Sequence, residues 1–178
     1  MKRFLSVSFV LGVLAAVAWA NPATRRPSDD VRRNQLKRNR DLVEKLVKGG
    51  LLLSDESDPL KRADHCNALA LSLAREIEDA ATNKEGPRAI EMGAHLEILL
   101  KQGVAGNLYA VLPEAPPRST RWKQIGEVGK QTMAVMDPLE KRLKQAADAD
   151  PDVRRALEAV GNGRAEVNNA LREAKTPR

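Results

Sequence analysis

The fold is decided by residues 58–102, which read DPLKRADHCNALALSLAREIEDAATNKEGPRAIEMGAHLEILLKQ. Asp58-Pro59 is a typical helix start, because aspartate caps the free N–H groups of a first turn and proline fits its first position. Small and apolar residues then recur every three or four positions, as on one buried helix face. They are Leu60, Ala63, Cys66, Ala70, Leu73, Ala74, Ile77 and Ala81. We predict a helix from residue 59 to residues 81–83, followed by a turn at Gly86-Pro87.

A second amphipathic helix is predicted over residues 87–102. Its apolar face holds Ala89, Met92, Gly93, Leu96, Leu99 and Leu100. Because the connection is short, the two helices should pack side by side as an antiparallel hairpin, residues 59–102. Residues 104–112 would add a short helix, and the proline-rich segment 113–119 predicts a stiff, extended linker.

The sequence before the hairpin also has a helical pattern. Asp29 and Asp30 can cap a helix that runs to Lys48. Gly49-Gly50 should end that helix, because glycine is common just past a helix C-terminus.

Two further helices are predicted after the linker. Ser119 or Thr120 would start a helix that reaches residue 147, and Asp150-Pro151 starts one that ends near residue 174. Pro138 falls on the polar side of the first, so we expect a kink there; a fresh helix start at residue 137 is the alternative. We therefore predict an all-α protein, a bundle of four to five amphipathic helices with a central antiparallel hairpin. Residues 29–112 and 120–174 would share that single domain.

The first twenty residues have the layout of a cleaved secretory signal. Lys2 and Arg3 precede an apolar run over residues 4–17, and Ala18-Trp19-Ala20 supplies the small residues that a signal peptidase reads. An uncleaved anchor is the alternative, but the run is shorter than the ~20 residues a membrane-spanning helix needs. Asn21 stands where a lipoprotein would have cysteine. We predict cleavage after residue 20, a flexible tail over residues 21–28, and a periplasmic or extracellular protein.

Composition argues against several classes of function. The chain has 178 residues, 30 Lys+Arg against 24 Asp+Glu, one Cys and two His. A single cysteine excludes an intramolecular disulfide and a multi-thiolate zinc site. Beyond the signal, Tyr109 and Trp122 are the only aromatic residues, too few for a surface on which nucleic-acid bases stack. We expect no metal, no cofactor and no nucleic-acid partner.

Catalytic motifs are missing from the sequence as well. It contains no His-Glu-x-x-His, no Gly-x-Ser-x-Gly and no nucleophile with an evident base. Its carboxylates have basic neighbours at helical spacing, as Glu140 has Lys144, which is typical of a solvated helix surface. We therefore expect a protein that is not an enzyme. A helical hydrolase with a carboxylate site that the pattern does not reveal is a remote alternative.

Three features are candidates for a function in binding. Cys66 lies mid-stripe, which predicts a buried thiol; an intermolecular disulfide or a redox-sensing thiolate would require exposure. Ile98 lies opposite its helix's main apolar face, with Ile90 between the two faces. Both suggest partner contact, although a helix in the middle of a bundle would also be apolar on two sides. Basic residues dominate residues 25–40, where Asp29 and Asp30 oppose Arg25, Arg26, Arg32, Arg33, Lys37, Arg38 and Arg40.

The segments DPLKRADHCNALALSLAREIEDA and RAIEMGAHLEILLKQGV resemble helical hairpins of exported bacterial proteins of unknown function. The resemblance covers residues 58–104 and implies export without implying an activity. We expect a non-catalytic exported protein that binds another cell-envelope component, most simply a protein, through the hairpin and helix 120–147. The alternative is a peripheral binder of anionic lipid head groups or wall polymers through residues 25–40, for which a solvated helix face is the plainer explanation. The sequence leaves the oligomeric state open.

Overall fold

The computed structural model describes residues 29–175, so the predicted signal (1–20) and tail (21–28) lie outside the described residues. Residues 29–175 are helical apart from short connections and contain no strand, which confirms the all-α class. The chain divides into two units, residues 1–40 and 41–178, which are described separately. Of the first unit, residues 29–40 form the start of helix α2 (Asp29–Asp55).

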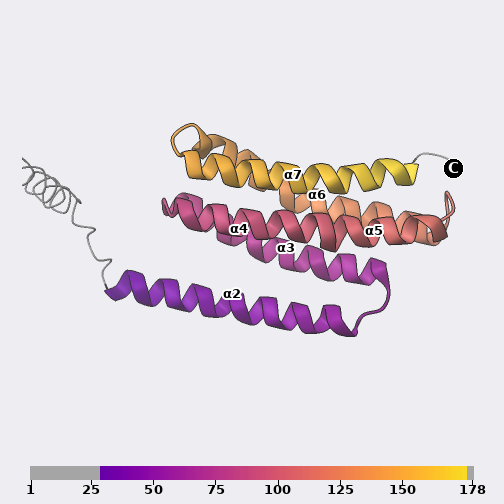
Figure 1. Cartoon of the computed structure of the whole chain (residues 1–178), viewed down its shortest axis with the longest axis horizontal. Coiled ribbons are helices and arrows are strands. Elements are labelled where there is room, and N and C mark those ends of the chain that lie inside the picture. The colour runs from indigo at the N-terminus through magenta and orange to yellow at the C-terminus, as the bar shows by residue number, and fades with distance from the viewer. Residues whose placement is uncertain (1–28, 176–178) are drawn as a thin grey trace, which may run out of the picture. The chain divides into compact units, whose positions relative to one another are not determined.

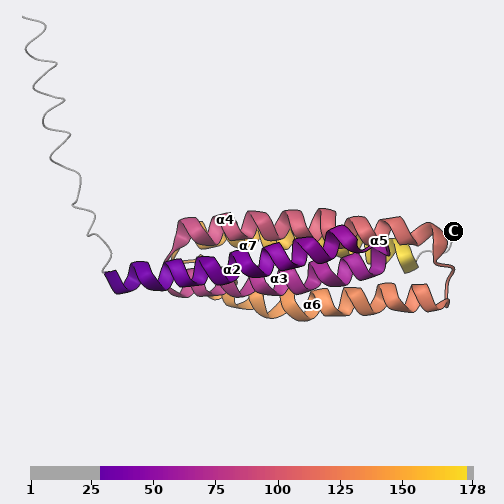
Figure 2. The same cartoon turned by 90° about the horizontal axis from the view of Figure 1, so that it is seen from below.

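The second unit contains a bundle of four long helical segments (Figures 1 and 2). They are built on α3 (Pro59–Thr82), α4 (Gly86–Ile98), α6 (Thr120–Ala147) and α7 (Pro151–Lys175). Each packs on two neighbours: α3 lies between α4 and α6, and α7 lies between the same two helices. The predicted hairpin of α3 and α4 is present, and α6 and α7 form a second antiparallel pair.

The two hairpins pack together so that helices from different hairpins run parallel. Along α3 and α6, Asn67 contacts Val128, and Glu78 further on pairs with Arg142. Along α4 and α7, residue numbers rise together in the same way, since Gly93 faces Ala156 and Gly163 faces the backbone of residue 97. Helices α3 and α6 therefore lie side by side, although about sixty residues separate them in the chain.

The start of α3 is the one predicted from Asp58-Pro59. The Asp58 carboxylate accepts a hydrogen bond from the N–H of Leu60 at 3.0 Å, and Pro59 is the first helical residue. The turn at the far end falls earlier than predicted. Lys84 adopts a positive φ of 58° there, whereas Gly86 already begins α4. The N–H of Glu85 donates to the Ala80 carbonyl. The turn is therefore complete at residue 85, before Gly86-Pro87.

The second helix of the hairpin does not end at residue 102. It continues from α4 through a π-helical stretch, Leu99–Ala105, into α5 (Gly106–Val111). The apolar face also continues, because Leu100, Val104, Ala105 and Leu108 are fully buried. Wider π turns shift the register of a helix, which keeps this face directed at the core. The prediction of a break near residue 103 is therefore wrong.

The predicted linker over residues 113–119 is not extended. A single 3-10 turn spans Leu112–Glu114, and Ala115 is buried. The N–H of Ser119 donates to the Pro116 carbonyl at 3.1 Å, and Arg118 adopts a positive φ of 69°. The prolines therefore stiffen a compact turn rather than a spacer.

Helix α2 does not end at Gly49-Gly50 but runs on to Asp55. No glycine among the described residues adopts a positive φ, so neither residue forms the left-handed cap that the sequence suggested. Gly49 instead lies directly against the Leu69 side chain of α3. Tertiary packing of this kind offsets the roughly 1 kcal/mol by which glycine disfavours a helix.

Helix α6 passes through Pro138 without a break, so a fresh start at residue 137 is excluded. Its N-cap is Ser119, whose hydroxyl accepts from the N–H of Trp122 at 3.1 Å. Pro138 is exposed, as its place on the polar side predicted. Helix α7 likewise starts at Pro151 and continues through Gly161 and Gly163.

Candidate partner-binding groove

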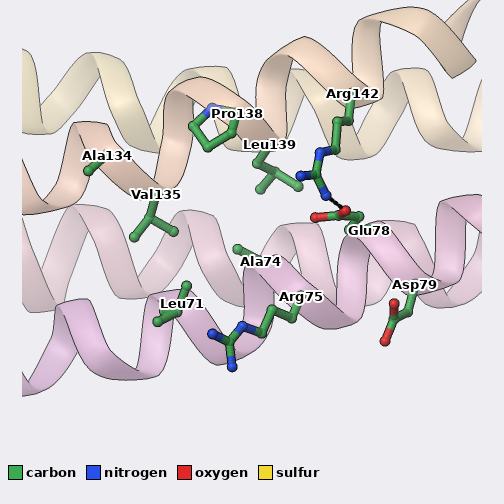
Figure 3. Close-up of a pocket in the computed structure, with 10 residues that line it drawn as sticks. All are labelled: Leu71, Ala74, Arg75, Glu78, Asp79, Ala134, Val135, Pro138, Leu139 and Arg142. Carbon is green, nitrogen blue, oxygen red and sulfur yellow. Dashed lines mark ion pairs between the residues drawn. The ribbon is translucent and has the colours of Figure 1, made fainter.

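A hollow with a volume of about 410 Å³ lies between α3 and α6 (Figure 3). We call it the α3–α6 groove. Both helices contribute five residues, and the lining comprises Leu71, Ala74, Arg75, Glu78, Asp79, Ala134, Val135, Pro138, Leu139 and Arg142.

The middle of the groove is apolar and open to solvent. Ala74 and Leu139 are buried and form its floor. Leu71 from α3 is 39% exposed, and Val135 from α6 is half-buried. The partly exposed side chains of Leu71 and Val135 give the groove an apolar surface on which another chain can pack.

Pro138 adds an unusual backbone feature to the α6 wall. Proline has no backbone N–H, so it cannot donate the helical hydrogen bond to the carbonyl four residues earlier. That carbonyl belongs to Ala134, which also lines the groove. The α6 wall therefore contains a carbonyl that lacks its usual donor four residues further on, next to the half-buried Val135.

One end of the groove is crossed by an ion pair. Glu78 on α3 and Arg142 on α6 point toward each other and form a salt bridge, drawn as a dashed line in Figure 3. The same two residues also line a second hollow of about 300 Å³ further along both helices, together with Thr82 and Ala146. Exposed ion pairs contribute little stability, so this bridge can open at small cost and join the two hollows.

A buried polar bridge sets the spacing of α3 and α6 beyond the end of the groove that is opposite the Glu78–Arg142 pair. The Asn67 side-chain amide donates to the Val128 carbonyl at 3.2 Å, and the Thr132 hydroxyl donates to the Asn67 oxygen at 2.8 Å. Asn67 and Thr132 are both buried. Because an unpaired buried amide is costly, this bridge holds the two helices in one register.

The groove is not evident in the amino-acid pattern, although the hairpin and helix 120–147 were both predicted to present the partner surface. Leu71 falls outside the apolar stripe predicted for α3, and Val135 is not among the buried residues of α6, so each resembles a scattered surface residue in the sequence. Only the parallel packing of α3 against α6 brings them together. Pro138 is the one residue that could have indicated the groove from the sequence, through the carbonyl that it leaves without a donor.

Of the predicted contact residues, Ile98 is 53% exposed and Ile90 is half-buried. A position in the middle of the bundle therefore does not explain why an apolar residue stands at position 98. Cys66 is a free, buried cysteine that is 2% exposed. Burial raises the pKa of its thiol, and nearby Arg62 opposes this only in part.

The basic residues lie only partly within the described structure. Arg33, Lys37 and Arg40 are exposed on α2, and Arg38 is half-buried. Arg25 and Arg26 lie outside the described residues, and the side chain of Arg32 is not described.

Glu140 was predicted to lie on a solvated helix surface, and that prediction is wrong. It is 8% exposed, and Arg164 of α7 lies 3.2 Å from its carboxylate. Arg164 also reaches Asp137 at 2.6 Å, and Lys144 lies 3.5 Å from Glu140. The neighbour expected from helical spacing is present, but the closer partner comes from the next helix.

Among residues 29–175, no three His, Cys, Asp or Glu side chains are grouped closely enough to hold a metal ion. None of the helices described here has the length and apolar character needed to cross a membrane. No protein-family model matches the chain. Neither curated proteins nor solved structures yielded a match to it.

Proposed function

We propose that this protein is a non-catalytic, exported binding protein that holds a segment of another cell-envelope protein in the α3–α6 groove. One observation carries the proposal: the partly exposed apolar side chains of Leu71 and Val135 line this groove together with Ala134, whose carbonyl lacks its usual helical donor. An apolar segment would cover Leu71 and Val135, and an N–H donor on it would reach the Ala134 carbonyl. Export is inferred from the first twenty residues of the sequence.

The proposal also fits the construction of the two helices. The Asn67–Thr132 bridge holds α3 and α6 together before any partner arrives, so the groove needs no folding step to form. Preformed surfaces lose little conformational entropy on binding. The Glu78–Arg142 pair crosses one end of the groove, so a longer partner segment would have to displace it.

Site-specific photo-cross-linking in cells of the source organism tests this function. A photoreactive residue would replace Val135 in the groove, Ile98 on α4, or the exposed Ala165 on α7 as the matched control. We expect a discrete protein adduct from position 135 and none from position 165. An adduct at position 98 as well would show that the partner surface extends over the hairpin. Equal labelling at positions 135 and 165 would contradict the proposal.

Two further variants make the test specific to the groove. Leu71→Asp should remove the adduct at position 135 without unfolding the protein, because Leu71 is partly exposed. Pro138→Ala restores an N–H for the Ala134 carbonyl, so it should weaken the adduct while making the fold more stable. Unchanged cross-linking in both variants would exclude the groove.

A second candidate function is peripheral binding to anionic envelope surfaces through residues 25–40. The exposed basic side chains of Arg33, Lys37 and Arg40 favour it. Salt separates the two functions, because attraction between exposed charges is screened within about 10 Å at 0.1 M salt. Retention on an immobilised anionic polymer should fall steeply with salt, whereas binding in an apolar groove should not.

A further inference from the structure

Helix α2 leaves an unusual number of large apolar side chains in solvent. Leu42 is the only buried residue among the side chains described for this helix. Four exposed residues recur at intervals of seven, four and four, and we call them the outer stripe. They are Leu36 (68% exposed), Val43 (56%), Val47 (56%) and Leu51 (62%). At about 100° per residue, they fall within a sector of about 80° on the helix.

The outer stripe is distinct from the face that packs on the bundle. Leu42 is buried, Leu46 and Leu53 pack partly buried against the core, and Gly49 lies against Leu69 of α3. These positions form a separate face of the helix. Packing of residues 41–55 on α3 therefore satisfies one apolar face and leaves the outer stripe uncovered.

Exposed basic residues lie near the N-terminal end of the outer stripe. By helical spacing, Arg40 falls inside the sector of the outer stripe, Arg33 falls at its edge, and Lys37 lies about 40° beyond that edge. Over residues 29–55 as a whole, α2 has seven basic residues against five acidic ones, a balance of 7 − 5 = +2, and five of the seven basic residues lie in its first twelve residues. A helix with an apolar face, basic residues beside it and low overall hydrophobicity matches the pattern of helices that lie in a membrane interface.

We propose that α2 binds the surface of an anionic lipid bilayer, with its outer stripe entering the interface and its basic residues on the head groups. The inference rests on the second candidate function and names the lipid bilayer as the surface. Charge alone would fit a wall polymer equally well, but an anionic polymer offers nothing to cover four apolar side chains. Each basic residue near an anionic bilayer is attracted, and the apolar side chains gain by leaving water.

Vesicle flotation with the chain beginning at Asn21 tests the proposal. We expect binding to vesicles of phosphatidylglycerol and phosphatidylcholine at low salt, weaker binding at high salt, and little binding to phosphatidylcholine alone. Val47→Asp should lower the affinity about tenfold or more, because it places a charge in the interface. Leu52→Asp is the matched control: Leu52 lies on the same helix, is 55% exposed and faces away from the outer stripe. That variant should stay within about twofold of the unchanged chain.

The possible outcomes distinguish a failure of this inference from a failure of the second candidate function on which it rests. Salt-sensitive retention on an anionic polymer, with equal vesicle binding by both aspartate variants, would keep surface binding and overturn the interfacial stripe. Binding to neither vesicles nor polymer would overturn both. A dimer in sedimentation experiments without lipid, broken by Val47→Asp, together with no vesicle binding, would assign the stripe to a second copy and overturn the lipid proposal. Circular dichroism of each variant ensures that the helix is intact.

Discussion

At the scale of single residues, Cys66 is held between two helices of the hairpin. A Cβ added at Gly103 in the π-helical stretch would come within 2.6 Å of its sulfur, which shows how closely the two backbones approach. Burial raises the pKa of the thiol, so the reactive thiolate is rare at neutral pH. The cysteine therefore acts as a small apolar side chain in the core.

We predict that Cys66 resists alkylation in the folded protein. At pH 7.5, iodoacetamide should label it only at the rate at which the fold opens, whereas labelling in urea should be complete. The folded thiol keeps its proton to higher pH than the unfolded thiol, whose pKa is about 8.5. Its contribution to stability is therefore present below that pH and is lost as pH rises through the folded pKa. Rapid labelling without denaturant, measured by intact mass, would contradict a buried thiol.

At the scale of helices, two glycines in α7 have opposite roles. A Cβ at Gly163 would come within 3.2 Å of the Glu97 Cα of α4 and 2.9 Å of a Leu100 methyl group. A Cβ at Gly161 would meet nothing within 4 Å. Gly163 therefore allows α4 and α7 to approach closely, together with Gly93, whereas Gly161 makes no such contact.

We predict that alanine changes stability with opposite sign at these two positions. Gly163→Ala should destabilise the fold by about 1–3 kcal/mol, because the helices must move apart or strain. Gly161→Ala should stabilise it by about 0.5–1 kcal/mol, since alanine favours a helix interior. Urea unfolding measures both. Two changes of the same sign would mean that α4 and α7 do not pack at Gly163.

At the scale of the whole molecule, the core belongs to the two hairpins. The cluster of buried apolar residues takes Leu42 from α2 and its other members from Leu60 onward. In addition, Arg62 of α3 donates to the carbonyls of Leu53 and Glu56, which ties the end of α2 to the bundle. Helix α2 is thus attached to the fold more than it is part of its core.

We predict that a chain beginning at Asp58 still folds cooperatively. Losing the contacts of Leu42 and its neighbours should lower the free energy of unfolding by about 2–5 kcal/mol. Far-UV circular dichroism during thermal unfolding measures this, with the chain from Asn21 as the reference. A broad, non-cooperative transition would show that α2 is required to complete the core. The shortened chain should also lose vesicle binding, while cross-linking from position 135 persists.

Features that depend on neighbouring residues in the chain could be predicted from the amino-acid pattern alone. The all-α class follows from apolar spacing, the start of α3 from Asp58-Pro59, and the continuity of α6 from the place of Pro138 on its polar side. Caps and helix periodicity act over a few residues, so a local pattern is enough to predict them.

Features that depend on residues far apart in the chain could not be predicted in this way. Gly49 stays helical because Leu69 packs on it, and Glu140 is buried because Arg164 arrives from another helix. The α3–α6 groove exists because two hairpins pack with α3 parallel to α6, an arrangement that no local pattern specifies. The apolar spacing of a helix shows which face is buried but not which helix covers it, and that choice places both the groove and the outer stripe.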